Sequence, residues 1–376
     1  MTNDALLSKT ISFLRFPLTV GVVFIHFNLS EGLTIHGAKF GADNPDWYFY
    51  FINFFSEVLG SICVPLFFMI SGFLFFYRKE FSGEVYMEKL KSRAKTLLTP
   101  YLLWNTIAIV WTLKRLLPYL SSYFYQPMEI RISLMRILNT YFYSVHNNGI
   151  FVGPTFDVSG AYPIDGPLWY VRELMLMVIL SPVIFWLIKR TNGWFVAIAG
   201  IVWYFSPVTI PEDNYFHWFL KALFFFSWGA FYSIVKRSII LEFRKYKFLP
   251  VIYIMVAIAD TLTKAMDYNS FIHYAGIILG VVSFVTVASY LLETGRVRVN
   301  DTLANSSFFI FALHQMFIID VGKLAITALH IDEHNYPALL SLYFLVPIGS
   351  VAFCLGLYMF LKRFTPKVCN LLTGGR

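Results

Sequence analysis

Two ionisable residues, Arg15 and His26, stand within an apolar stretch that reads LRFPLTVGVVFIHF. They are eleven positions apart, so on a helix they lie within about 20° of one face and about 16 Å apart along the axis. A guanidinium binds anions, and an imidazole can take a proton from a hydroxyl near neutral pH. Because ionisable groups in a membrane span are costly, each is a candidate for a functional site. The alternative is that both side chains reach opposite membrane surfaces from the ends of a span.

The composition of the chain excludes a soluble fold of this size. Of the 376 residues, 57% are hydrophobic and only 14% are charged, and the mean hydropathy is +0.62. The sequence therefore predicts an all-α, polytopic membrane protein. A span needs about 20 apolar residues, and ten segments are predicted, at about 11–29, 55–77, 96–117, 168–189, 193–210, 216–236, 248–265, 271–292, 304–323 and 338–361.

Lysine and arginine gather in alternate connections between these segments, in 78–95, 189–190, 236–247 and 296–298, and again after residue 361. Cytoplasmic loops retain basic residues, so both termini are predicted to be cytoplasmic. The expected location is the cytoplasmic (inner) membrane, with the lipid bilayer as a partner. The net charge of +8 is then a topological signal, and no nucleic acid is expected as a partner.

One membrane-embedded domain is predicted to fill residues 1–376. Its long connection, at about 118–167 on the outer side, includes a segment at 130–141 with an apolar helical face. This segment is either an interfacial helix or a short helix packed over the bundle.

The three cysteines, Cys63, Cys354 and Cys369, lack metal-ligand spacing. We interpret them as packing residues. No metal site is predicted.

Polar residues near the cytoplasmic ends of the second and third segments are candidates for binding a donor substrate. Ser71 and Gly72 either line a gap for an extended ligand or, for Gly72 above all, allow close helix packing. Lys89, Arg93 and Lys95 precede the third segment. They either set the topology or bind the phosphates of a nucleotide-containing donor.

The fourth segment opens with Trp169, Arg172 and Glu173, at the predicted depth of His26. Adjacent residues on a helix point about 100° apart. The two adjacent charges either neutralise each other or, because they are not expected to face the same partner, leave one of them available to His26.

The ninth segment places His314 near the middle of the membrane. It either lines the same channel as His26 or is a hydrogen-bonded core histidine. Lys221 and Asp320 are further charges within predicted spans, and the sequence indicates no role for them.

These elements, in this order, resemble the acyltransferase-3 family of integral-membrane acyltransferases. The likeness covers the whole chain and rests on R-x10-H at Arg15 and His26 and on VPLFFMISGFLFF, TPYLLW, GPLWYVRELM and SSFFIFALHQMFI. The resemblance implies that an acyl group, usually acetyl, passes from cytoplasmic acyl-CoA to a carbohydrate or glycan hydroxyl. Acyl-CoA is then a co-substrate, and no tightly bound cofactor is expected.

By the same resemblance, Arg15 and His26 are the essential pair. Members often carry two arginines in the first cytoplasmic loop, whereas this chain has Lys89, Arg93 and Lys95 there. The donor-binding positions therefore depart from the family pattern.

Acyl transfer from a thioester needs a base for the hydroxyl proton and donors for the developing oxyanion. We assign His26 as the base, Glu173 as the group that fixes its tautomer, and Arg15 to the pyrophosphate or pantetheine carbonyl of the donor. In a variant, His26 is a transient acyl carrier. The expected acceptor-binding or channel-lining residues are Trp169, Arg172 and His314.

The alternative function is a secondary transporter or flippase for a polar or lipid-linked substrate, because charges within spans also mark transport paths. That function predicts internal symmetry or broken helices in matched halves, and the sequence indicates neither. CoA release in purified membranes, with and without His26, distinguishes the two functions.

Overall fold

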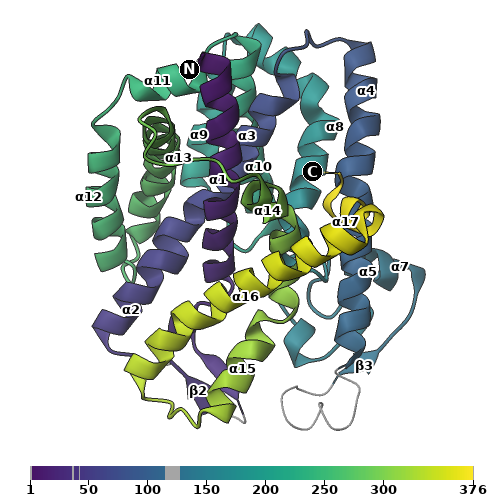
Figure 1. Ribbon diagram of the computed structural model, residues 1–376, viewed down its shortest axis with the longest axis vertical. Helices are drawn as coiled ribbons and strands as arrows, with labels where there is room; N and C mark the ends of the chain where they lie inside the picture. The colour runs from purple at the N-terminus through teal and green to yellow at the C-terminus, as the bar shows by residue number, and fades with distance from the viewer. Residues whose placement is uncertain (1, 36–37, 42, 115–127, 376) are drawn as a thin grey trace.

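The computed structural model describes residues 2–35, 38–41, 43–114 and 128–375, and most of them are helical. Figure 1 shows the helices as one bundle with α1 near its centre and α16 crossing it obliquely. The α-helices are α1 (Asn3–Ile25), α2 (Asp46–Asn53), α3 (Cys63–Phe76), α4 (Gly83–Arg93), α5 (Thr99–Leu113), α7 (Leu134–Phe142), α8 (Trp169–Arg190), α9 (Trp194–Phe205), α10 (Tyr215–Ile234), α11 (Ile239–Arg244), α12 (Leu249–Leu262), α13 (Asn269–Glu293), α14 (Asp301–Leu313), α15 (Ile318–Ala328), α16 (Tyr336–Phe364) and α17 (Pro366–Thr373).

The protein is a polytopic membrane protein with six or seven candidate spans among the described residues. Six helical segments are long and apolar enough to cross a bilayer, and a seventh is counted if α14 and α15, bent by 55°, form one span. Helices occupy all ten predicted windows, but α9 and α12 are shorter apolar helices. In α10, polar residues such as His217 and Lys221 interrupt the apolar sequence. The finer count of ten spans stays a prediction.

Two long helical segments contain a π-helical turn. Residues Asp46–Phe76 continue from α2 to α3 through a π turn at Phe54–Leu59, and Gly83–Leu113 continue from α4 to α5 through a π turn at Ala94–Leu98. Such turns rotate the following residues relative to a regular helix and are frequent at functional sites. The first of them contains Glu57.

Helices α3 and α10 pack at unusually close range. A Cβ atom added at Gly72 would lie 1.9 Å from the carbonyl oxygen of Phe226, and one added at Gly229 would lie 1.8 Å from that of Met69. Only glycine fits at both positions, because any side chain would enter the backbone of the other helix. The structure therefore gives Gly72 a packing contact, which is the second of its two predicted roles.

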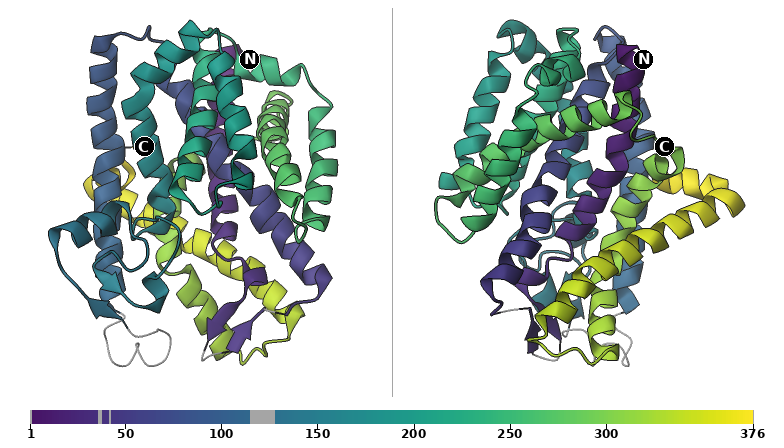
Figure 2. Two further views of the ribbon diagram at one scale, coloured as in Figure 1. Left: turned by 180° about the vertical axis from the view of Figure 1, so that it is seen from behind. Right: turned by 60° about the vertical axis from the view of Figure 1, so that its left-hand side comes forward.

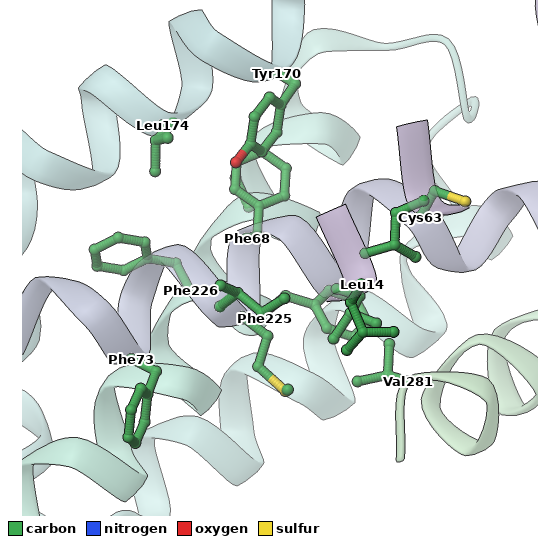
Figure 3. Close-up of a cluster of buried hydrophobic side chains, with 14 of the residues drawn as sticks. Leu14, Cys63, Phe68, Phe73, Tyr170, Leu174, Phe225, Phe226 and Val281 are labelled. Carbon is green, nitrogen blue, oxygen red and sulfur yellow. The ribbon is translucent and has the colours of Figure 1, made fainter. Parts of the chain in front are cut away.

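The main hydrophobic core joins α1, α3, α8, α10 and α13. Figure 3 shows Leu14 of α1, Phe68 of α3, Phe225 of α10 and Val281 of α13 in one cluster, with Tyr170 of α8 beside Phe68. The rings of Tyr170 and Phe68 lie 4.7 Å apart between centroids. Packing of this density fixes α1 against its neighbours, so the polar residues of α1 are held in defined positions.

The outer connections contain the few strands of the described structure, so the all-α prediction holds apart from two short hairpins. Strands β1 (Leu33–Ile35) and β2 (Ala38–Phe40) pair antiparallel, as do β3 (Glu129–Ile130) and β4 (Phe151–Val152). The predicted helix at 130–141 is α7, whose apolar residues are exposed, Leu134 by 75%. Residues 118–127 of the predicted outer loop lie outside the described residues.

The N-terminus and the predicted cytoplasmic segments around α4 and α11 share one end of the molecule, whereas the C-terminus, near α17, lies closer to mid-height. The N-terminus, α11 and the far tip of α4 lie at the top of Figure 1, and the outer hairpins lie at the bottom. Ion pairs join distant parts of that end, Arg78 to Asp4 at 4.0 Å and Arg244 to Glu293 at 2.6 Å. Helix α17 folds back on α5, where the Trp104 Nε1 donates to the carbonyl of Leu372 at 2.9 Å. Figure 2 shows the same division of the bundle from two further sides.

Candidate active site

Three cavities follow α1 from the end near α4 towards the outer hairpins. The inner cavity, of about 140 Å³, is lined by Arg15 and Thr19. The outer polar cavity, of about 270 Å³, and the loop cavity, of about 370 Å³, are both lined by His26. Phe311 lines the inner and the outer polar cavity and so forms part of the wall between them. Arg15 and His26 therefore border successive compartments along one helix.

The inner cavity gathers two arginines around a tyrosine. Arg15 of α1 and Arg93 of α4 both line it, together with Ser71 and Tyr170. The Ser71 Oγ and the Tyr170 hydroxyl lie 3.1 Å apart. Within the described residues, neither guanidinium has a carboxylate within ion-pairing distance. Two such cations in a partly buried cavity favour an anionic ligand.

The predicted donor-binding residues divide into two groups. Ser71 and Arg93 line the inner cavity, whereas Lys89, Lys95 and Gly72 do not. The Lys89 ammonium donates to the carbonyl oxygen of Phe75 at the end of α3, and it lies 4.9 Å from the Phe75 ring centroid. Lys95 is exposed. Lys89 therefore already has a hydrogen-bond partner, the carbonyl at the end of α3, and needs no donor substrate to satisfy its charge.

His26 lines both outer cavities, and His314 lies beside it but lines none of the three, so His314 is the hydrogen-bonded core histidine of the two predicted alternatives. Their ring centroids lie 5.2 Å apart, and His314 is fully buried in the turn that separates α14 from α15. The His314 Nδ1 lies 3.0 Å from the carbonyl of Ile310. A carbonyl only accepts, so Nδ1 carries the proton and Nε2 presents a lone pair. That Nε2 has no hydrogen-bond partner in the described part of the chain.

Arg172 and Glu173 pair with each other, which is the self-neutralising arrangement that the sequence left open. The Arg172 Nε donates to the Glu173 Oε1 at 2.9 Å. The Arg172 Nη1 donates to the carbonyls of Phe142 and Ala161, at 2.5 and 2.7 Å, and so fastens the outer loop to α8. The two Cα positions do point about 100° apart, but the long arginine side chain bends round to reach the neighbouring carboxylate. Neither residue lines a cavity that His26 borders, so the structure offers no contact for Glu173 as the group that orients His26.

Trp169 lies where the sequence predicted, beside His26 on the outer polar cavity. Its ring centroid is 5.1 Å from that of Trp218. The two indoles give one wall of this cavity an aromatic surface, which suits stacking against an apolar ligand face.

Four polar residues of the outer polar cavity were not predicted from the sequence to be site residues. They are Glu57, Glu212, Lys221 and His273. Glu57 and Lys221 had a detectable signal, because each is a charge inside an apolar segment. Glu212 is in a loop and His273 near a helix start, where polar residues are ordinary. Asp320, the other unassigned charge, pairs with Lys114 at 2.6 Å.

The carboxylate of Glu212 is held in its charged form. Burial by itself raises the pKa of Glu212, but a hydrogen bond from Tyr274 and the nearby His273 and Lys221 lower that pKa below its usual value overall. A carboxylate that stays charged accepts strong hydrogen bonds from hydroxyl groups.

Asp165, in the outer loop just before the fourth predicted span, has the opposite environment. It is 2% exposed, and neither carboxylate oxygen has a hydrogen-bond partner among the described residues. Burial raises the pKa of Asp165 well above its usual value. Among the described residues, no group of three or more His, Cys, Asp or Glu side chains is placed to hold a metal ion.

The comparisons with known proteins identify the family of the chain. The model of the acyltransferase-3 family, described as an acyltransferase domain, matches residues 9–359. The chain is also similar to the succinoglycan biosynthesis protein ExoH of Rhizobium meliloti (strain 1021), with 24% identity over 386 residues that cover 99% of this chain and 94% of the relative. No solved structure matches the chain.

Proposed function

Because this chain belongs to the acyltransferase-3 family and is a membrane acyltransferase, we propose that it transfers an acyl group from cytoplasmic acyl-CoA to a hydroxyl of a carbohydrate acceptor. Acetyl is the acyl group we favour. The observation that carries this proposal is the placement of Arg15 within α1 and of His26 at its C-cap, one on the inner cavity and the other on both outer cavities. A donor and an acceptor that approach from opposite sides would meet at the wall between these compartments.

The inner cavity supports binding of the donor. Arg15 and Arg93 supply cations for phosphate or carbonyl oxygens, and residues of α3 and α8 also line the cavity. A pantetheine arm is long and thin, so it can extend past Ser71 and bring the thioester towards Phe311. We place both termini in the cytoplasm, with the chain in the cytoplasmic membrane and ten spans in all, on the distribution of basic residues.

The proposed reaction needs one base, which takes a proton from the acceptor and later returns it to the leaving group. The acceptor hydroxyl oxygen attacks the thioester carbonyl carbon while His26 takes the hydroxyl proton. The tetrahedral intermediate then releases the CoA sulfur, which receives the proton from His26, and the products are an ester and free CoA. The Nε2 lone pair of His314, close to His26, can accept a hydrogen bond from the His26 ring and so orient it. This role replaces the one predicted for Glu173.

A covalent variant uses the same residues. The His26 imidazole would attack the thioester, release CoA and carry the acyl group until an acceptor hydroxyl takes it. Release of CoA before any acceptor is added would distinguish this route from direct transfer.

The transporter alternative has one observation in its favour, the broken helix formed by α14 and α15. Broken helices in matched halves mark transporter sites. Membership in an acyltransferase family favours the enzyme, and His314 at the break has a role in the proposed chemistry.

The test is acetyl-CoA-dependent CoA release and ester formation by purified protein in detergent or nanodiscs, with a membrane glycan extract as acceptor. His26→Ala is expected to lower turnover by about 10²- to 10⁴-fold, the usual contribution of a general base. Arg15→Ala is expected to weaken donor binding. Full activity in His26→Ala, or no binding of acyl-CoA by the wild type, would exclude this mechanism.

A matched pair of variants tests the inner cavity as the donor site. Arg93→Ala is expected to raise the KM for acetyl-CoA, whereas Lys95→Ala, two positions further and exposed, is expected to leave it unchanged. Equal effects of the two substitutions would indicate a general contribution of the basic segment and not a site at Arg93.

A further inference from the structure

The outer polar cavity has the composition of a binding site for a polar ligand. Its charged residues come from separate elements: Glu57 from the π turn between α2 and α3, Glu212 from the loop before α10, and Lys221 from α10 itself. His273 of α13 and His26, the residue that directly follows α1, also line the cavity. Such a convergence depends entirely on tertiary packing.

Two of these groups have neighbours that fix them. The Asn28 Nδ2 donates to the Glu57 Oε1 at 3.2 Å from outside the cavity, and Tyr274, which also lines the cavity, is close enough to Glu212 to lower its pKa. The lining side chains are therefore positioned before a ligand arrives, which lowers the entropic cost of binding.

His273 is fixed in the same way. Its Nδ1 lies 2.8 Å from the Asp260 Oδ2, and Asn269 donates to the Asp260 Oδ1 at 2.8 Å. With Nδ1 engaged by the carboxylate, Nε2 is the ring nitrogen left to serve the cavity.

One wall of the cavity is aromatic. The Trp218 ring lies 5.1 Å from Trp169 and 4.6 Å from Tyr162, centroid to centroid. Rings of this kind offer an apolar surface to the C–H face of a pyranose, while the polar groups opposite reach its hydroxyls. Stacking plus convergent hydrogen-bonding groups is the chemistry that recognises a sugar.

The balance of charge narrows the class of sugar. Among the described lining residues, Glu57 and Glu212 are acidic, and Lys221 is the sole lysine or arginine. A uronate or another anionic sugar would bring its charge next to two carboxylates in a confined space, which is unfavourable. Hydroxyl groups, in contrast, donate well to carboxylates.

We propose that the outer polar cavity binds an uncharged sugar unit of the acceptor and holds one of its hydroxyls at His26. Glu57 and Glu212 accept from its other hydroxyls, and Lys221 and His273 provide further hydrogen bonds. The inference rests on the proposed acyl transfer and adds the class of acceptor and the residues that select it.

The first measurement locates the ester in the organism that encodes this chain. Glycan from cells with and without the gene is hydrolysed under conditions that retain esters, and tandem mass spectrometry identifies the acylated monosaccharide. An ester on a neutral sugar is the expected result. An ester on a uronate, or on a sugar with a phosphate or carboxylate substituent, overturns the inference but leaves acyl transfer standing. No gene-dependent ester overturns both.

The second measurement tests the residues. Glu57→Gln and Glu212→Gln are expected to lower the ester content at least about tenfold, since a hydrogen bond to a charged group contributes about 1.5–3 kcal/mol. Asp213→Asn, at a neighbouring position that does not line the cavity, is the matched control and is expected to stay within about twofold of wild type.

A readout independent of the acceptor separates this loss from misfolding. Acetyl-CoA is expected to raise the thermal midpoint of the purified Gln variants as much as that of the wild type, because the donor occupies a different cavity. Unchanged ester content in both Gln variants would show that the acceptor binds elsewhere. Loss of the acetyl-CoA response together with the ester would show that the substitutions act on the whole fold, and it too overturns the assignment.

Discussion

His26 and His314 lie with their ring centroids 5.2 Å apart, although they come from the first and the ninth of the predicted spans. The contact forms because α1 packs directly against α14 and because the helix breaks at His314. An imidazole with a defined tautomer thus lies beside the proposed base, at the boundary of the outer cavities.

His314→Ala is expected to lower kcat about 10- to 100-fold, less than His26→Ala, because His314 positions the base and does not itself take the proton. The KM for acetyl-CoA should not change, and the pH at which activity is half-maximal should shift. His146→Ala, on an exposed loop residue, is the control. A pH profile identical to that of the wild type would contradict the positioning role.

Phe311 is expected to keep water on the outer side away from the thioester. Phe311→Ala should raise CoA release in the absence of acceptor, because the wall between the inner and outer polar cavities is opened. Phe308 lines the inner cavity alone, so Phe308→Ala is the matched control and should not raise this release. Removing a buried phenyl ring costs about 3–5 kcal/mol, so Phe311→Leu is measured in parallel as a milder change. Equal release by the Phe311 and Phe308 variants would argue against a wall at Phe311.

Gly72→Ala is expected to destabilise the bundle by at least about 1–3 kcal/mol, the usual cost of overpacking. The added methyl group would meet the Phe226 carbonyl of α10. Gly349→Ala, on α16 with open space around the new Cβ, should leave the protein unchanged. The measurement is the thermal midpoint in detergent. An unaltered midpoint for Gly72→Ala would show that α3 and α10 separate easily.

Asp165 is expected to make the protein less stable as the pH rises. The unfolded carboxyl releases its proton at about pH 3.9, whereas burial raises the pKa of Asp165 in the folded state well above that. Between these two values the folded state binds the additional proton, so the free energy of unfolding falls with increasing pH. Asp165→Asn removes this dependence and should raise the thermal midpoint more at pH 8 than at pH 5. A constant difference between the two proteins across that range would exclude the ionisation of Asp165 as its cause.

The donor half of the site was more predictable than the acceptor half. Arg15, Ser71 and Arg93 were all predicted to contact the donor, and all three line the inner cavity, whereas the other donor candidates, Gly72, Lys89 and Lys95, do not. Tyr170 and Phe311, which complete that cavity, are aromatic residues in apolar runs and carry no signal of their own. Lys89 has the same charge as Arg93, yet it is engaged by a backbone carbonyl.

The acceptor half depends on bends that no local pattern indicates. Glu57 faces its cavity from a π turn, and His314 reaches His26 from a helix break. Glu173 was predicted to contact His26 because the two residues lie at the same predicted depth. In the structure the flexible side chain of Arg172 donates a hydrogen bond to Glu173 instead.

By itself the sequence determined that the chain is a helical membrane protein and that Arg15 and His26 share a face of its first span. Hydropathy and the helical period are local properties, so they can be read from neighbouring residues. Only the tertiary structure decided that His26 meets His314, and that Glu57, Glu212, Lys221 and His273 surround one cavity. Those contacts depend on how each helix is rotated, bent and packed against the others, and side-chain packing across the whole bundle sets these quantities together.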